Sequence, residues 1–263
     1  MVKVGSDFLP KPLCSRGLSS VKRELLRQEL LRSIEFKLNK KMEGIEDCSD
    51  EAKLMKLITR AFGTGFNSEG FKMLGASLDW LEFQSLTIRQ KELLLLGKST
   101  LLQPIQADDM EDLTWKRKGT RPGSFPDKRL KQLNELLSSF QMQRLMDLLN
   151  DGFALKELRR FFKIIIGKNG KQLLSPWMTD QLIINAIIPF LWQTQKAKQR
   201  FVAMRILEEM KPENNKYTRM WKHWGLEAEN AFDSQGLNAL FKDKCARKKC
   251  LSCSVGKKLM YDQ

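Results

Sequence analysis

The sequence predicts an all-α protein. Apolar residues recur at intervals of three and four along most of its 263 residues, and no stretch of four or more residues alternates as a half-buried strand would. Helix-capping or helix-stopping residues bound many of these periodic stretches. The chain is 42% hydrophobic and 29% charged, which excludes the disordered and collagen-like classes. We therefore expect two packed helical lobes with about ten helices in all.

The amino-terminal lobe is expected over residues 19–113, after an irregular segment at residues 1–18. Ser49 is typical of a helix N-cap, whereas Gly63 and Gly97 are typical of the position just after a helix. The predicted helices are, in chain order, 19–44, 49–62, one that begins at Asn67, and 81–96.

A break in the periodicity at residues 114–126 is interpreted as a basic hinge loop between the lobes, because it holds two prolines and two glycines within twelve residues. The carboxyl-terminal lobe then covers residues 127–263 and includes a cysteine cluster. Its most buried helix is expected to begin at Ser175-Pro176 and to include residues 182–191, which are apolar nearly all round. Pro189 is expected to kink this helix, since proline removes one hydrogen bond from the ladder.

The charge balance favours a polyanionic partner. The chain has 46 Lys and Arg against 31 Asp and Glu, which gives a formal net charge of +15. DNA or RNA is the usual partner of such a protein, because each cation that neutralises a phosphate releases a bound counterion. A basic surface that serves only solubility is the alternative.

Membrane association is not expected. The longest nearly apolar run, residues 182–192, is shorter than the roughly 20 residues that a membrane-spanning helix needs. The first residues also lack an apolar stretch of signal-peptide length, so we expect a cytoplasmic protein with reduced cysteines.

Two segments concentrate cations and are the candidate nucleic-acid contacts. Their residues are Trp115, Lys116, Arg117, Lys118, Arg121, Lys128 and Arg129 in and after the hinge, and Lys244, Arg247, Lys248 and Lys249 near the carboxyl terminus. Cations and an aromatic ring on irregular backbone suit phosphate contact and base stacking. The alternative is a solvated loop that Trp115 only anchors to the core.

Cys245, Cys250 and Cys253 form the most specific local pattern. A Cys-x2-Cys pair places two sulfurs on one metal ion, and the neighbouring cations favour the thiolate that metals require. A zinc ion or an iron–sulfur cluster would need a fourth ligand, for which the candidates are Cys14, Cys48, His223 and Asp233, none at a diagnostic spacing. Zinc is favoured over a cluster, because cluster motifs usually contain four cysteines. The alternative is a reduced cysteine-rich segment without metal.

Catalytic motifs are not evident. His223 is the single histidine, and we interpret it as a partly buried packing residue. Glu35-Phe36-Lys37 and Glu51-Ala52-Lys53 match the Glu-x-Lys of metal-dependent nucleases, but both lie in predicted helices where that chemistry needs strands. No glycine-rich phosphate loop follows a strand.

Several stretches together resemble a bacterial family, common in Bacteroidetes, known as domain of unknown function 2851. These stretches are Leu57–Gly63 with Asn67, Phe71 and Leu74; Arg121-Pro122-x2-Phe125-Pro126; Ile183-Ile184-Asn185-x3-Pro189-Phe190; Asn230–Leu237; and the three carboxyl-terminal cysteines. Gly236 departs from the family pattern, which leads us to expect alanine. The resemblance is to the carboxyl-terminal helical part of the family, whose longer members carry a region similar to a restriction-type nuclease. It implies that any nuclease centre would come from a separate subunit.

These observations lead to the expectation of a non-catalytic protein that binds nucleic acid and could serve as the accessory subunit of a nuclease-like partner. Two alternatives stay open. One is a protein–protein interaction or scaffold subunit without nucleic-acid contact, and the other is a zinc or iron–sulfur protein with a catalytic role.

Overall fold

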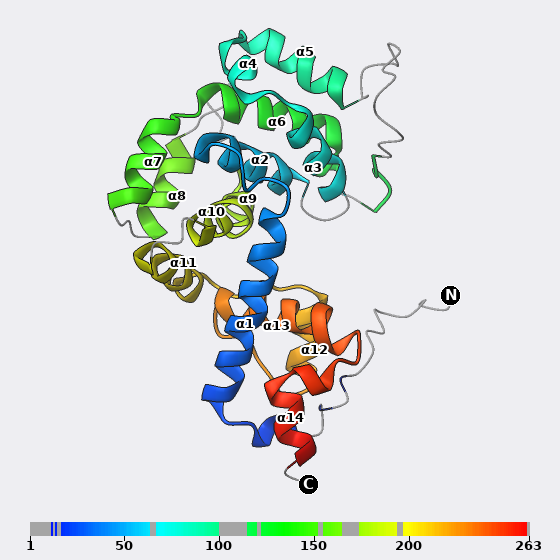
Figure 1. The fold of residues 1–263 in the computed structure, drawn as a ribbon. Coiled ribbons are helices and arrows are strands. Elements are labelled where there is room, and N and C mark those ends of the chain that lie inside the picture. Colours follow the sequence, from blue (N-terminus) through cyan, green and yellow to red (C-terminus); the bar gives the residue numbers. More distant parts are fainter. Residues whose placement is uncertain are drawn as a thin grey trace. The chain divides into compact units, whose positions relative to one another are not determined.

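The structure, a computed structural model, contains helices and no strand in the part of the chain that it describes. That part comprises Pro12, Cys14 and residues 17–63, 67–99, 115–119, 122–151, 155–164, 174–193 and 197–261. The predicted all-α class is confirmed (Figure 1). Among the described residues, no helix is both long enough and apolar enough to cross a membrane.

The chain forms two compact units, which differ from the lobes expected from the sequence. Unit 1 combines Met1–Lys41 with Ala203–Gln263, and unit 2 is Met42–Val202. The basic loop at residues 114–126 therefore falls within unit 2 rather than between two lobes. The physical reason is that the first long helix buries its apolar stripe against carboxyl-terminal helices.

Unit 2 is a bundle of helices. Its helices are α2 (Asp50–Phe62), α3 (Ser68–Ser77), α4 (Trp80–Ser85), α5 (Ile88–Lys98), α6 (Pro126–Ser139), α7 (Met142–Asp151), α8 (Leu155–Ile164), α9 (Pro176–Leu182) and α10 (Ile188–Gln193). A π-helical turn, Ile183–Ile187, joins α9 to α10, and α2 packs against both this turn and α3. The core of unit 2 lies at this junction, where Leu54, Ile58 and Phe71 are fully buried.

The expected kink at Pro189 takes the form of that π turn. The N–H of Ile188 bonds to the carbonyl oxygen of Ile183, five residues back, so the helix is one residue wider just before the proline. Widening accommodates a residue that supplies no N–H to the ladder. Because Ile183, Ala186 and Ile187 are buried, the whole element stays in the core as predicted.

Unit 1 is built on the helix α1 (Arg23–Met42), whose residues up to Lys41 belong to it. Its other elements are two short 3-10 turns (Leu18–Ser20 and Cys250–Ser252), the end of α11 (Ala197–Glu209), α12 (Lys216–His223), α13 (Ala231–Leu240), a π turn (Phe241–Cys245) and α14 (Ser254–Tyr261).

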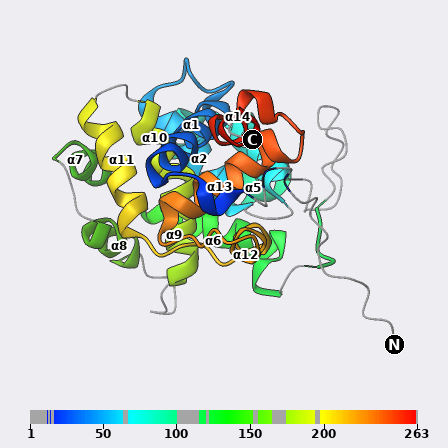
Figure 2. The same cartoon turned by 90° about the horizontal axis from the view of Figure 1, so that it is seen from below.

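Close packing of α1 and α13 holds unit 1 together. The two helices lie side by side in both views (Figures 1 and 2), and a Cβ atom placed on Gly236 would lie 2.7 Å from the Cβ of Leu30. Leu30 and Ile34 are almost fully buried in this region. The close approach explains why Gly236 replaces the alanine expected from the family pattern, since even a methyl group would force the helices apart.

Candidate functional site

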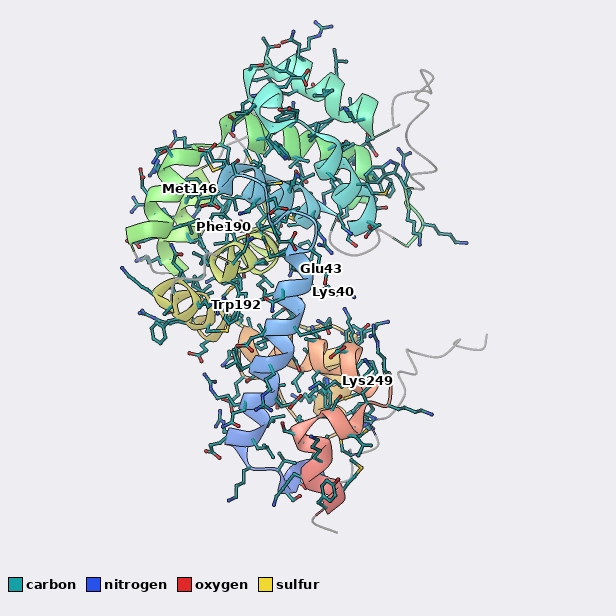
Figure 3. The ribbon with its side chains drawn as sticks, viewed as in Figure 1. Lys40, Glu43, Met146, Phe190, Trp192 and Lys249 are labelled. Carbon is teal, nitrogen blue, oxygen red and sulfur yellow. The ribbon has the colours of Figure 1, made fainter. Side chains whose placement is uncertain are left out.

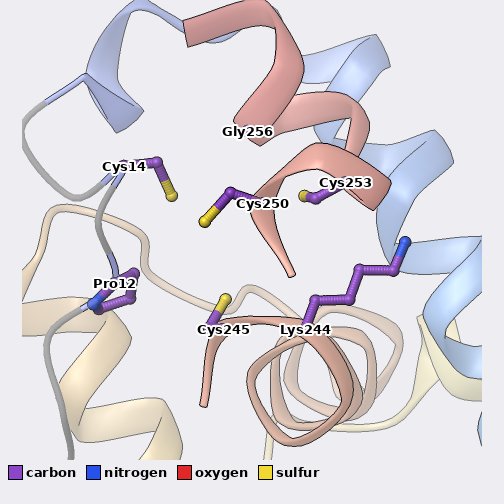
Figure 4. Close-up of a pocket in the computed structure, with 7 residues that line it drawn as sticks. All are labelled: Pro12, Cys14, Lys244, Cys245, Cys250, Cys253 and Gly256. Carbon is purple, nitrogen blue, oxygen red and sulfur yellow. The ribbon is translucent and has the colours of Figure 1, made fainter. Parts of the chain in front are cut away.

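Four cysteine side chains from three segments of unit 1 line one small cavity (Figure 4). Cys245 ends the π turn after α13, Cys250 begins the second 3-10 turn, and Cys253 immediately precedes α14. Cys14 reaches the same cavity from the amino-terminal segment. The cavity has a volume of about 10 Å³, which is about the space that one water-sized sphere needs.

The backbone between Cys245 and Cys253 is folded back on itself by local hydrogen bonds. The N–H of Lys249 bonds to the carbonyl oxygen of Lys244 at 2.9 Å, and Lys248 has a positive φ of 54°. A Cβ atom on Gly256 would lie 2.6 Å from the carbonyl oxygen of Cys250. Glycine at position 256 therefore allows the Cys250 turn to lie directly on the start of α14.

Burial favours the protonated thiol at three of these cysteines, Cys14, Cys245 and Cys253. It raises the pKa of Cys14 to about 11, and the charges of Cys253 and Cys250 raise it further. Burial also raises the pKa of Cys245 and of Cys253. For Cys253, backbone hydrogen bonds from Gly256 and Val255 act in the opposite direction. The four cysteines line the same cavity, and backbone hydrogen bonds from Val255 and Gly256 lower the pKa of one of them, Cys253.

The structure brings one of the four candidate fourth ligands to the three predicted cysteines. Cys14 lines the cavity, whereas Cys48 belongs to unit 2, where its sulfur lies 3.0 Å from the Nζ of Lys56. His223 is exposed at the end of α12 rather than partly buried as expected, and Asp233 accepts a backbone hydrogen bond from Glu229. Among the described residues, no group of three or more Cys, His, Asp or Glu side chains stands in an arrangement ready to hold a metal ion.

Glu29 on α1 fastens the cysteine segment to the rest of unit 1. Its side chain is fully buried, pairs with the ammonium group of Lys244, and accepts the backbone N–H of Ser254 at 3.0 Å. Burial alone would raise the pKa of Glu29, but the hydrogen bonds from Lys244 and Ser254 hold it below its usual value. The sequence does not single out this carboxylate, because nothing in the pattern of α1 distinguishes Glu29 from the other acidic residues there.

The predicted hinge segment is anchored to unit 2. The indole of Trp115 packs edge-on against Phe71, with ring centroids 5.2 Å apart, and donates a hydrogen bond to the carbonyl oxygen of Ser99 at 2.7 Å. The side chain of Asn67 accepts the N–H of Lys116 at 2.8 Å and donates to its carbonyl oxygen at 3.0 Å. The geometry thus favours the anchoring interpretation of Trp115 over base stacking.

The cations predicted to contact nucleic acid in and after this segment differ in how far they are exposed and in whether they already have a partner. Lys116, Lys118 and Lys128 are exposed. Arg117 lies 3.2 Å from Asp127, and Arg129 is half-buried with hydrogen bonds to Ser124 and Gln132. Arg121 lies outside the described residues.

Near the carboxyl terminus, the exposed cations gather on the turn between Cys245 and Cys250. Arg247, Lys248 and Lys249 are all exposed (Lys249 is labelled in Figure 3). Arg247 has a loose pairing with Asp243 at 3.9 Å, and Lys248 and Lys249 form no ion pair with any residue that the structure describes. Lys244 is not part of this exposed group, since Glu29 holds it.

The Asn230–Leu237 stretch takes part in a part-buried polar network. Asn230 caps α13 by accepting the N–H of Asp233. Gln235 accepts a hydrogen bond from Lys37 and donates one to Glu213 at 2.5 Å. The network thus joins α1 to α13 through a lysine that the Glu-x-Lys pattern had drawn attention to, here in a structural role.

The titration of Lys37 is expected to make the stability of unit 1 rise with pH. Burial lowers the pKa of Lys37 to about 8, Lys242 adds to this effect, and Glu213 opposes it. Since the native pKa lies below that of the unfolded chain, the unfolded state binds more protons, and raising the pH favours the native state. We expect the free energy of unfolding to rise by about 1 kcal/mol between pH 7 and pH 9 relative to the Lys37→Met variant. Urea denaturation of both proteins at each pH measures this difference, and parallel pH profiles would contradict it.

Part of the chain is similar to a known protein family. Residues 105–216 match a family described as a protein of unknown function (DUF2851). The expected resemblance is confirmed over these residues, which are less than half of the chain and include the 122–126 and 183–190 stretches. The Asn230–Leu237 stretch and the cysteine cluster lie outside the match. No curated protein and no solved structure matches the chain.

Proposed function

We propose that this chain binds nucleic acid, without catalysing a reaction itself, through the exposed cations of Arg247, Lys248 and Lys249. The observation that carries the proposal is the placement of these three consecutive cations on one tight turn, with no ion pair from a described residue to Lys248 or Lys249. Phosphate groups are bound best by cations that need not first leave another partner.

The contacts that hold the 245–250 turn in place favour nucleic-acid binding by its cations. Glu29 and Lys244 fix the base of the turn to α1, and the Lys249 N–H is bonded to the Lys244 carbonyl oxygen. A turn held in place loses little conformational freedom when it binds a phosphate backbone. The overall charge of +15 adds long-range attraction for a polyanion.

A charge-matched pair of triple variants tests the proposal. In the first, Arg247, Lys248 and Lys249 are each replaced by glutamine. In the control, the exposed cations Lys156, Arg160 and Lys163 of α8 are replaced in the same way, so both proteins lose the same net charge. Fluorescence anisotropy with labelled duplex DNA, single-stranded DNA and RNA is measured at stepped salt concentrations.

We expect the turn variant to bind at least about tenfold more weakly than wild type at low salt, with its salt slope reduced by up to about 0.9 for each phosphate that is no longer neutralised. The control should stay within about twofold of wild type. Equal weakening in both variants would show that only the bulk charge matters. Unchanged binding by the turn variant would reject this surface, and a stoichiometric protein that co-purifies in place of nucleic acid would favour the scaffold alternative.

A further inference from the structure

We propose that Cys14, Cys245, Cys250 and Cys253 bind a single Zn²⁺ ion, which ties the amino-terminal segment to the carboxyl-terminal turn. This inference does not depend on nucleic-acid binding. It extends the three-cysteine pattern of the sequence by assigning the fourth ligand.

The donor set fits a structural zinc site. Zinc in structural sites takes four ligands in a tetrahedron, and four thiolates are one of its common sets. Here the four thiols line one cavity and come from three different segments, so they approach the centre from different directions (Figure 4). Cys250 begins a 3-10 turn, Cys250–Ser252, and Cys253 caps its end immediately before α14, so both cysteines lie in one short connection that lines the cavity.

The size of the cavity favours one ion over a cluster. Its volume is about 10 Å³, which accommodates one water-sized body and is too small for several iron and sulfide ions. At one edge of the cavity the backbone is closely packed, since an added Cβ on Gly256 would lie 2.6 Å from the carbonyl oxygen of Cys250.

The electrostatic surroundings suit a site with bound thiolates. Four thiolates and one Zn²⁺ carry a net charge of −2, which nearby positive groups must offset. The backbone hydrogen bonds from Val255 and Gly256 to Cys253 come from the first turn of α14, where the helix dipole also favours negative charge. Lys244 also lines the cavity, with its ammonium group paired to Glu29.

Binding requires a small rearrangement of side chains. The thiols do not stand ready at metal-ligand geometry. The proposal therefore requires the four side chains, which already line the cavity, to turn toward its centre. Each thiol that binds the ion loses its proton to solvent, so binding releases up to four protons and should weaken at acid pH.

Metal analysis of the full chain tests the proposal with a matched control. Wild type is purified under reducing conditions without chelator, supplied with Zn²⁺, and passed through a desalting column. We expect about one zinc per chain. Replacing Cys14 by serine should weaken Zn²⁺ affinity at least about 100-fold in a competition assay with a chromophoric chelator. Cys48→Ser removes the fifth cysteine, which lies outside the cluster, and should retain wild-type affinity.

Two measurements on wild type keep the test independent of variant folding. Co²⁺ in place of zinc should give the visible absorption of a tetrahedral thiolate site. Titration with a thiol reagent should release one zinc for every four protected thiols. Failure of wild type to retain zinc, equal loss of affinity in both serine variants, or a brown protein that contains iron and sulfide would each overturn the proposal. A disulfide between two cluster thiols that persists in reducing buffer would overturn it as well.

Discussion

Replacing Glu29 by alanine is expected to lower the free energy of unfolding of unit 1 by about 4 kcal/mol. The side chain of Glu29 is fully buried, and it is the partner of both the Lys244 ammonium group and the N–H of Ser254. Only 16% of the Lys244 side chain is exposed, so the truncation leaves a poorly solvated cation without its counter-charge. It also leaves the first N–H of α14 without this acceptor.

Two substitutions on the same helix separate this effect from helix propensity. Glu29→Gln keeps an acceptor oxygen but removes the charge, and it should cost about half as much as alanine. Glu24→Ala removes an exposed carboxylate from the first turn of α1 and should cost less than about 1 kcal/mol. Chemical denaturation followed by tryptophan fluorescence compares the three variants. A loss below about 1 kcal/mol for Glu29→Ala would mean that Lys244 finds a different partner or solvent at little cost.

Local signals predicted local structure well. The Ser49 hydroxyl accepts the N–H of Ala52 at 3.2 Å, as its polar cap pattern predicted, and α2 ends just before Gly63. Both features depend on residues within one turn of the helix end, so a short stretch of sequence contains all the information needed. The fully apolar segment around Ile184 was likewise predicted to be buried, because no orientation of that helix exposes a polar face.

Features that depend on partners distant in the chain were not predictable. The stripe of α1 shows that a face is buried, but it does not identify α13, far along the chain, as the neighbour. The same limit applies to the cysteines. The spacing of Cys245, Cys250 and Cys253 singled out three of them, whereas Cys14 enters the cluster through tertiary structure alone. Burial of Glu29 belongs to this class too.

The hinge interpretation was incomplete for a related reason. Proline and glycine content predicted irregular backbone around Trp115, and composition alone cannot show that such a loop is anchored. The anchors are Asn67 and Phe71, which sit one turn apart at the start of α3. Gly63, Asn67 and Phe71 are spaced four residues apart. This regular spacing is visible in the sequence, but only the tertiary structure shows its role in positioning the loop.

Gly63→Ala is expected to destabilise unit 2 by on the order of 3 kcal/mol or more. A Cβ atom at this position would lie 2.4 Å from the carbonyl oxygen of Asn67 and 2.7 Å from the Cα of Ser68. Both atoms belong to backbone, so no side-chain rotation relieves the clash. The Asn67 oxygen also accepts the N–H of Phe71 in the first turn of α3, so a shift there disturbs the start of the helix.

Gly97→Ala makes the same chemical change, but it is expected to raise the free energy of unfolding instead of lowering it. Gly97 lies inside α5, rather than just after a helix as the sequence predicted, with nothing within 4 Å of an added Cβ. Alanine should therefore stabilise the helix by about 0.5–1 kcal/mol. Urea denaturation measures the change in the free energy of unfolding for both variants. The opposite signs of these two changes separate the effect of the steric clash from the effect of backbone entropy.

Because Asn67 holds the backbone of Lys116, Gly63→Ala should also loosen the 115–118 segment, seen as faster hydrogen exchange at the Lys116 amide. Stability equal to wild type with an unchanged exchange rate would mean that α2 and α3 separate at little cost, and that the close approach at Gly63 is not what positions this loop.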